Sequence, residues 1–384
     1  MRMINLALQG GGSHGAFTWG VLDALLEDGR IGFEGLSGTS AGAVNAVALA
    51  SGWVHGLAKG MDPREAAREK LAGIWYRVSA IGSLGTLQQQ FMRMLWGGLP
   101  PELSPGNIIG NAWRGLLSPY QSNPLDINPL RTMLEEEIDF AAIAAQRALR
   151  VFVSATHVNT GKAVIFTGRQ LDARAVLASA CLPMLFQAVE IEGEKYWDGG
   201  YSVNPALSPL IKDCSTADLL LVQINPLRRE QTPRSSAEIL DRINELTFNA
   251  SLLTQMRAID FVNQLLAEGA VSHAHCKIVR VHRVDGGPAL DAFPTSSRTS
   301  ADGALISQLF DAGKRAGKEW LEHHFEAVGH RSTVDIRRDY LDDTRMELPY
   351  PSPTLPRSVG RGFRPWLARL LRQQQGGGTP ATGG

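Results

Sequence analysis

A serine flanked by glycines is the residue best suited to chemistry in this 384-residue sequence. The motif Gly38-Thr39-Ser40-Ala41-Gly42 follows a short apolar run and precedes a stretch of small apolar residues. A GxSxG sequence between a strand and a helix predicts a sharp turn that exposes the serine hydroxyl as a nucleophile. Side chains in place of the glycines would obstruct this turn, and N–H groups at the start of the helix would stabilise negative charge near the serine. We therefore predict that Ser40 is a nucleophile.

A glycine-rich loop after the first apolar run is the second candidate site. Its residues are Gly10, Gly11, Gly12, Ser13, His14 and Gly15. Beside Ser40, this loop would offer backbone N–H groups to an oxyanion. As a GxGxxG turn it would instead bind a dinucleotide, and an acidic residue about 20 positions further on should end the next strand. Glu34 is near that spacing but precedes the serine motif without ending a strand, so we favour the oxyanion hole.

A serine nucleophile also needs a proton acceptor. None of the nine histidines lies in a loop after a late strand, where an α/β-hydrolase would place its histidine. Asp198 precedes Gly199 and Gly200, and such a sequence by itself usually forms only a turn. The residues themselves therefore leave the base for Ser40 open.

The elements that must position these residues alternate between short apolar runs and helical patterns. Strands are predicted over residues 3–8, 31–37, 149–155, 162–167, 218–224 and 277–284, with a hairpin over 186–197 that turns at Glu192-Gly193. Helices are predicted over residues 14–28, 41–51, 61–79, 171–181, 236–268 and 301–326. Strands that alternate with helices predict an α/β fold whose sheet is covered on both faces.

Composition divides the chain into a folded part over residues 1–330 and a Pro-, Arg- and Gly-rich flexible tail over 345–384. Within the folded part, residues 81–130 have a heavy apolar load with weak periodicity, which predicts an insertion. This insertion could form a lid or acyl-chain wall, or it could pack on the core. In the tail, residues 362–372 place apolar side chains among arginines, which suits an interfacial helix as well as a solvated or partner-binding segment.

Composition also excludes several classes of protein. The 38 basic and 38 acidic residues balance, which argues against a globally basic nucleic-acid binder. No apolar run is long enough for a transmembrane helix, and the run at the start is too short for a signal peptide. Three scattered cysteines and the isolated pair His273 and His275 predict neither a disulfide framework nor a metal site. We expect a cytoplasmic protein, with peripheral membrane contact as an option.

Three motifs in this order resemble the patatin-like phospholipase family: GGGSHG at 10–15, GTSAG at 38–42 and DGG at 198–200. Residues 151–168 and 174–183 also resemble the family's strand, turn and strand segment and the helix before its Asp motif. The resemblance covers residues 3–225, weakens over 236–326 and is absent from the tail. It implies a three-layer α/β/α fold with a central, mostly parallel sheet.

The resemblance further implies a catalytic dyad of Ser40 and Asp198, with an oxyanion hole formed by the 10–15 loop through Gly11 and Gly12. The reaction would be hydrolysis of a lipid acyl ester through an acyl-Ser40 intermediate, without a cofactor or metal. Phospholipids, lysophospholipids and acylglycerols remain open as substrates. A catalytically silent lipid-binding or regulatory protein on this fold, and a nucleotide-binding oxidoreductase, are the alternatives.

Two positions depart from the family pattern. The family commonly has Arg or Lys where this chain has His14, and we hypothesise that protonated His14 assists the oxyanion. The family often has Asp where this chain has His157, to which we assign no role.

Overall fold

The computed structural model describes residues 1–95, 118–124, 126, 128–229, 232–272, 276–291, 293, 297 and 302–341. The chain divides into the units Met1–Leu341 and Asp342–Gly384. The predicted tail and the middle of the predicted insertion lie outside the described residues, so the lid and interfacial-helix hypotheses stay predictions.

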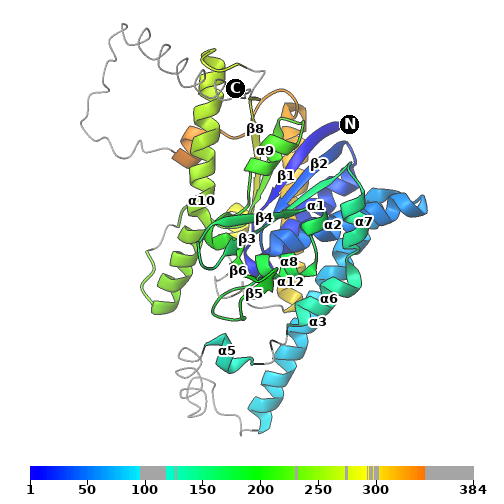
Figure 1. The fold of residues 1–384 in the computed structure, drawn as a ribbon, viewed down its shortest axis with the longest axis vertical. Helices are drawn as coiled ribbons and strands as arrows, with labels where there is room; N and C mark the ends of the chain where they lie inside the picture. The colour runs from blue at the N-terminus through cyan, green and yellow to red at the C-terminus, as the bar shows by residue number, and fades with distance from the viewer. Residues whose placement is uncertain are drawn as a thin grey trace, which may run out of the picture. The chain divides into compact units, whose positions relative to one another are not determined.

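A mixed, mostly parallel sheet of eight strands forms the centre of the described structure (Figure 1). Its strands are β1 (Arg2–Leu8), β2 (Ile31–Gly38), β3 (Arg150–His157), β4 (Ala163–Thr167), β5 (Val189–Ile191), β6 (Glu194–Asp198), β7 (Asp218–Gln223) and β8 (Arg280–Asp285). The strand order is β5-β6-β3-β2-β1-β7-β8, and β4 pairs with β3 off this path. Strands β3, β2, β1, β7 and β8 run parallel to one another, whereas β4, β5 and β6 pair antiparallel.

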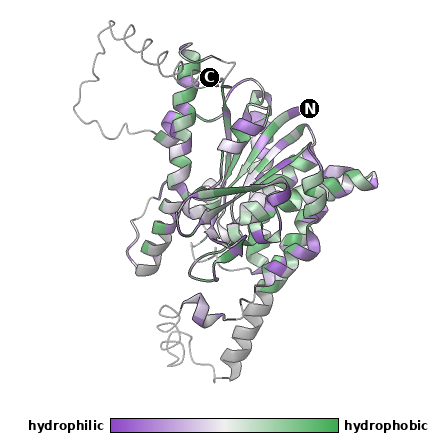
Figure 2. Cartoon of the chain, in the orientation of Figure 1, coloured by the Kyte–Doolittle hydropathy of each residue, from purple (hydrophilic) through white to green (hydrophobic). Residues whose placement is uncertain are grey.

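Helices surround this sheet. They are α1 (Gly15–Asp28), α2 (Ala41–Lys59), α3 (Pro63–Leu95), α5 (Pro119–Ser122), α6 (Pro129–Glu137), α7 (Phe140–Ala145), α8 (Ala173–Ser179), α9 (Ser208–Asp213), α10 (Ser236–Ala267), α11 (Gly287–Asp291) and α12 (Gly303–His324). The covering helices carry both hydrophilic and hydrophobic residues (Figure 2), as expected where one helix face packs on a sheet and the other meets water. Within the described residues, no helix combines the length and the apolar character that crossing a bilayer requires.

The side chains of β7 show what packs on each face of the sheet, because successive residues of a strand point to opposite sides. Leu220 and Val222 join a hydrophobic cluster with buried residues of α1, α2, α3, α8 and α12. Leu219 and Leu221 join a second cluster with buried residues of α9 and α10. Helices therefore lie on both faces, α10 on one and α1 and α2 on the other (Figure 1). The predicted three-layer α/β/α fold is confirmed.

Two helices extend further along the chain than the sequence predicts. The prediction stopped the second helix at residue 51, but α2 continues to Lys59 through Gly52 and Gly56. A Cβ on Gly52 would lie 2.5 Å from the Ala66 carbonyl oxygen, so these glycines serve the close packing of α2 on α3. Helix α3 likewise extends past residue 79 to Leu95, into the predicted insertion. Single glycines lower helix propensity without ending a helix.

Candidate active site

The Ser40 turn joins the end of β2 at Gly38 to the start of α2 at Ala41. Ser40 has φ +54° and ψ −122°, a conformation that L-residues rarely adopt. A Cβ on Gly38 would lie 2.3 Å from the Gly42 carbonyl oxygen, and one on Gly42 would lie 2.2 Å from the Leu8 carbonyl oxygen. Both glycines are therefore required for the turn, and they hold Ser40 at the carboxyl edge of the sheet.

Neighbouring elements support this strained turn through hydrogen bonds. The Ser40 N–H donates to the Ser179 hydroxyl, at 2.8 Å, from the end of α8. Thr39 donates its hydroxyl to the Val203 carbonyl at 3.1 Å and also bonds the Ser154 hydroxyl in β3. These contacts fix the backbone on both sides of the Ser40 hydroxyl, and the Ser40 side chain itself makes none of them.

The 10–15 loop lies directly against the Ser40 turn. A Cβ on Gly10 would lie 2.7 Å from the Ser40 Cβ, and one on Gly15 would lie 2.6 Å from the Ala41 Cβ. The Gly10 N–H donates to Asn204 Oδ1 at 2.7 Å, and the Gly15 N–H turns back to the carbonyls of residues 12 and 13. Hydrogen bonds among the described residues leave the N–H groups of Gly11 and Gly12 open, as is usual at a helix start.

The order of the strands in the sheet brings Asp198 close to the Ser40 turn. In the sheet, β3 lies between β2 and β6, with Val153 opposite Gly38 and Ala155 opposite Asp198. A Cβ on Gly199 would lie 2.9 Å from the Thr39 Cγ2. The Asp motif therefore packs against the serine motif although 158 positions separate Ser40 from Asp198 in the sequence.

The Asp198 carboxyl is completely buried. Its Oδ1 accepts the Gly200 N–H at 2.7 Å, while Oδ2 has no hydrogen-bond partner within the described part of the chain. Burial raises the pKa of Asp198 to about 7, although the Gly200 N–H and the Ser40 hydroxyl favour the ionised form. An aspartate with such a pKa can accept a proton near neutral pH.

Residues 6–211 match the family model described as Patatin-like phospholipase, a span that includes all three motifs and more than half of the chain. The chain belongs to the patatin-like phospholipase family. Membership supports lipid acylhydrolase activity in general terms. Among curated proteins none is significantly similar to this sequence.

One similar solved structure is that of VipD from Legionella pneumophila, with 14% sequence identity and a TM-score of 0.41. The likeness covers 89% of this chain and 73% of the VipD chain.

The two departures from the patatin-like pattern have defined surroundings in this chain. The buried His14 ring bonds the Ser297 hydroxyl through Nε2 at 2.8 Å and meets Phe293 edge-on. Its proposed help to the oxyanion stays a prediction. His157 Nε2 lies 2.8 Å from Glu194 Oε2, in a pair between β3 and β6.

The described residues offer little support for a dinucleotide-binding site or a metal site. Glu34 accepts the N–H groups of Ser215 and Thr216, so its carboxylate is already engaged with backbone. Among the described residues, no group of three His, Cys, Asp or Glu side chains could hold a metal ion. The pair His273 and His275 lies outside those residues.

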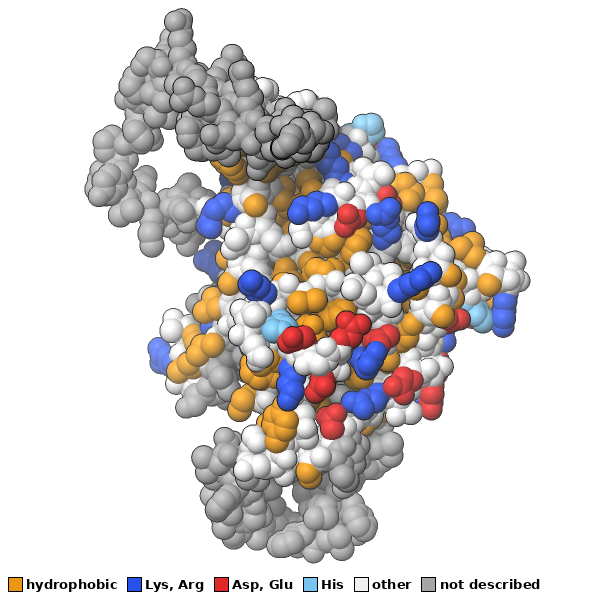
Figure 3. All heavy atoms as spheres, viewed as in Figure 1, with side chains coloured by type: hydrophobic (Ala, Val, Ile, Leu, Met, Phe, Trp, Pro, Cys, Tyr) orange, Lys and Arg blue, Asp and Glu red, His pale blue; other side chains and the backbone are white. Residues whose placement is uncertain are grey.

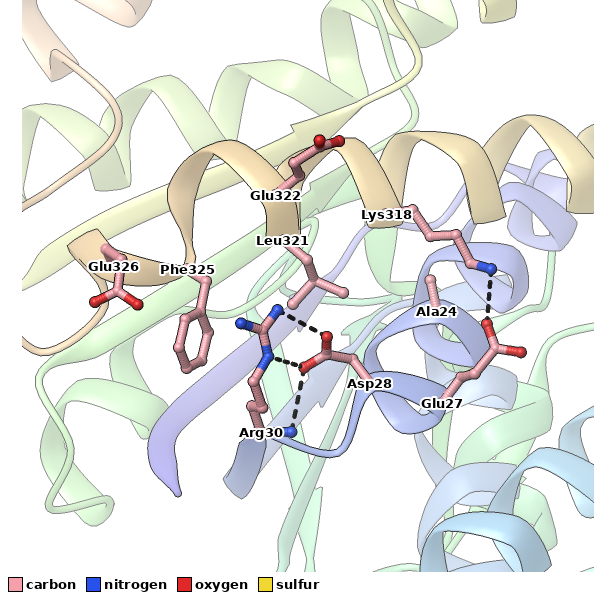
Figure 4. Close-up of a pocket in the computed structure, with 9 residues that line it drawn as sticks. All are labelled: Ala24, Glu27, Asp28, Arg30, Lys318, Leu321, Glu322, Phe325 and Glu326. Atoms are coloured by element: carbon pink, nitrogen blue, oxygen red, sulfur yellow. Dashed lines mark hydrogen bonds and ion pairs between the residues drawn. The ribbon is translucent and has the colours of Figure 1, made fainter.

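A hollow of about 540 Å³ between α1 and α12 is remote from this site (Figure 4). Within it, Arg30 pairs with Asp28 at 2.8 Å and Lys318 with Glu27 at 2.9 Å. Asp28 and Arg30 precede β2, whereas Ser40 follows it, and ligands of open α/β sheets bind at the carboxyl ends of strands. We assign this hollow no part in the chemistry of this patatin-like chain.

Sequence reasoning missed the polar residues around the predicted Ser40 and Asp198 pair. Ser154 and Thr156 are buried in β3, and Thr156 donates its hydroxyl to the Asp198 carbonyl at 2.8 Å. Ser179 and Asn204 hold the serine turn and the glycine loop. The sequence does contain a signal for Ser154 and Thr156, since these two hydroxyl residues interrupt the apolar run VFVSATH of β3. For Asn204, only a spatial neighbour reveals the role.

Proposed function

We propose that this chain is a serine acylhydrolase that cleaves lipid acyl esters with a Ser40–Asp198 dyad. The observation that carries the proposal is a buried carboxyl with a pKa of about 7 beside a strained serine turn. The open N–H groups of Gly11 and Gly12 lie in the loop packed against the same serine. The close approach of these groups supports the proposal, because a nucleophile, a base and oxyanion donors are the minimum set for acyl transfer.

The proposed reaction proceeds in two halves. Asp198 takes the proton from the Ser40 hydroxyl as its oxygen attacks the ester carbonyl, and the loop N–H groups bind the resulting oxyanion. Asp198 then gives the proton to the leaving alcohol oxygen, which leaves an acyl-Ser40 ester. In the second half Asp198 takes a proton from water, and the hydroxide attacks the acyl-Ser40 carbonyl. Collapse of this second intermediate releases the carboxylic acid and returns the proton to Ser40.

Exposed apolar side chains beside Asp198 support a lipid as the substrate. Met184 and Leu185 are 75% and 51% exposed, and they follow Cys181, whose carbonyl accepts the Asp198 N–H at 2.8 Å. Tyr201, 36% exposed, comes three residues after Asp198. Large apolar side chains left in water next to a reactive centre favour acyl chains over polar substrates. Phospholipids, lysophospholipids and acylglycerols all fit this argument.

Labelling with a fluorophosphonate probe, followed by peptide mass mapping, tests the proposal. We expect the probe to modify Ser40 in the wild type and in Asp213→Asn, an exposed carboxylate control. Ser40→Ala should remain unlabelled, and Asp198→Asn should react about 10²–10⁴-fold more slowly, the usual contribution of a general base. A folded wild type that stays unlabelled would contradict the proposal and favour a lipid-binding or regulatory role.

A further inference from the structure

Gly10 is held by side chains at both of its backbone polar groups. Asn204 accepts the Gly10 N–H through Oδ1 at 2.7 Å and donates Nδ2 to the Gly10 carbonyl at 3.3 Å. Asn225 donates its own Nδ2 to the same carbonyl at 2.7 Å. Two side-chain amides from separate parts of the chain therefore converge on one carbonyl oxygen.

The orientation of that carbonyl determines where the next N–H points. The peptide unit that joins Gly10 to Gly11 is planar, and in a trans peptide the C=O and N–H point to opposite sides. Bonds that hold the Gly10 oxygen on one side therefore direct the Gly11 N–H to the other. Glycine tolerates many backbone conformations, so without these bonds this peptide plane would be free to rotate.

A buried amide cluster, comprising Gln9, Asn204, Asn225 and Asn249, keeps the two donors in place. Gln9 Oε1 accepts the backbone N–H and the side-chain Nδ2 of Asn225, at 3.0 and 3.2 Å. Gln9 Nε2 donates to Asn249 Oδ1 at 3.3 Å, and Asn249 Nδ2 donates to the Pro226 carbonyl at 3.0 Å. Buried hydrogen bonds of this kind are strong and directional because water does not compete for them.

The segment that contains Asn225 also packs closely against Gly11 of the loop. A Cβ on Gly11 would lie 2.9 Å from Ile224 Cδ1 and 3.6 Å from Asn225 Oδ1. The segment after β7 thus packs against the peptide whose N–H would meet the oxyanion. Asn225 and Asn249 lie outside the span that matches the family model.

We propose that Asn225, together with Asn204, is a positioning residue that holds the Gly10–Gly11 peptide with the Gly11 N–H directed toward the oxyanion. This inference rests on the proposed function of Ser40. Asn225 acts through the Gly10 carbonyl and touches no reacting atom. Its loss would let the peptide turn, which removes one oxyanion donor and brings a carbonyl oxygen toward the developing negative charge.

Asn225→Leu tests the inference, since leucine has a similar volume and no donor. Hydrolysis of a p-nitrophenyl ester by the full chain should show a kcat about 10²-fold lower with KM unchanged, the scale of one lost oxyanion donor. An alkyl trifluoromethyl ketone, which forms a tetrahedral adduct with a reactive serine, should bind weaker by the same factor. Asn204→Ser, which loses the second donor to the same carbonyl, should shift both values in the same direction.

Asn263→Leu is the matched control. Asn263 lies on α10 and exchanges two hydrogen bonds with the Val279 backbone, at 2.9 and 3.0 Å. It should lower the melting temperature without changing kcat or inhibitor affinity. Asn225→Ser provides a smaller replacement if the leucine variant does not fold.

The outcomes separate this inference from the function on which it rests. A wild type that neither reacts with a fluorophosphonate nor cleaves the ester would overturn both. An active wild type, together with a folded Asn225 variant of unchanged kcat and inhibitor affinity, would overturn the positioning role alone. Parallel losses in kcat and inhibitor affinity, with KM constant, would support it.

Discussion

At the Asp198 carboxyl, burial and hydrogen bonding act on ionisation in opposite directions. Burial disfavours the charged form and raises the pKa to about 7, whereas the Gly200 N–H and the Ser40 hydroxyl stabilise the carboxylate. An exposed aspartate has a pKa of about 3.9 and is a weak base at neutral pH. In the proposed dyad, the buried position would supply the basicity that a histidine provides in a triad.

The pH dependence of hydrolysis should follow the ionisation of Asp198. Because the base must be deprotonated, kcat/KM should rise tenfold per pH unit below about pH 7 and level off above it. A pH–rate profile on a p-nitrophenyl ester measures this limb, and its midpoint should match that of fluorophosphonate labelling. A midpoint near pH 4 would show that Asp198 ionises as an ordinary exposed carboxyl.

The same raised pKa predicts that Asp198 destabilises the fold at neutral pH. The unfolded chain releases this proton near pH 4 and the folded chain near pH 7, so the free energy of unfolding falls as the pH rises between these values. A pKa shift of this size corresponds to a loss of about 4 kcal/mol. Asp198→Asn should therefore melt at a higher temperature than the wild type at pH 8, and the difference should vanish near pH 4. Equal differences at both pH values would contradict this account.

At the scale of elements, α12 sets the position of the helix that begins at the glycine loop. Its backbone approaches that of α1 closely, since a Cβ on Gly313 would lie 1.9 Å from the Phe17 carbonyl oxygen. A Cβ on Gly20 would similarly lie 2.0 Å from the Phe310 carbonyl oxygen. Lys314 adds an ion pair with Asp23 at 2.7 Å. Because α1 starts at Gly15, this contact links a helix outside the family match to the glycine-rich loop at residues 10–15.

Gly313→Ala should weaken this contact, whereas Gly73→Ala should not. Overpacking of a tight contact costs about 1–3 kcal/mol. A Cβ at Gly73, in α3, would meet no atom within 4 Å, so alanine should stabilise that helix by about 0.5–1 kcal/mol. Urea unfolding of both variants measures the free energies. Similar effects of the same sign at both positions would contradict the packing argument.

At the scale of the whole molecule, the amino edge of the sheet holds the segment after α12 through Asp218. This buried carboxylate accepts hydrogen bonds from Arg280 Nη2 at 2.7 Å, His282 Nε2 at 3.0 Å and the Gly329 N–H at 2.8 Å. Burial would raise the pKa of Asp218, but these three donors hold it well below its usual range. Elsewhere on the visible face, basic and acidic side chains are interspersed (Figure 3), consistent with the zero net charge.

Asp218→Asn should destabilise the protein by about 3–5 kcal/mol at pH 7, because it leaves the partly buried Arg280 guanidinium without a carboxylate partner. Asp218 contributes its full stabilisation above about pH 4 and loses it as the pH falls toward its lowered pKa. Urea unfolding should show that the difference in free energy of unfolding between the wild type and the variant is smaller at about pH 3 than at pH 7. The fluorophosphonate reaction of Ser40 at pH 7 should be unchanged, since Asp218 begins β7 at the edge opposite Ser40. An equal difference at both pH values would contradict the prediction that Asp218 stabilises the fold only when it is ionised.

Features that depend on neighbouring residues could be predicted from the sequence. The strand, turn and helix around Ser40, the Gly29 end of α1 and the hairpin at Glu192-Gly193 follow from glycine positions and apolar spacing, and all are confirmed. The order of the three motifs also indicated the family, which the family model confirms. Turn chemistry and periodicity act over a few residues, so one sequence is enough to predict them.

The contacts that bring distant residues together, and their surroundings, depend on the packing of the whole fold. The adjacency of β2, β3 and β6 brings Asp198 to Ser40, and complete burial then moves the Asp198 pKa to about 7. The amide cluster joins Gln9 to Asn249 across 240 positions, and its members look like ordinary polar residues in the sequence. Desolvation and side-chain hydrogen bonding depend on what packs around a group, and that packing comes from all layers of the fold at once.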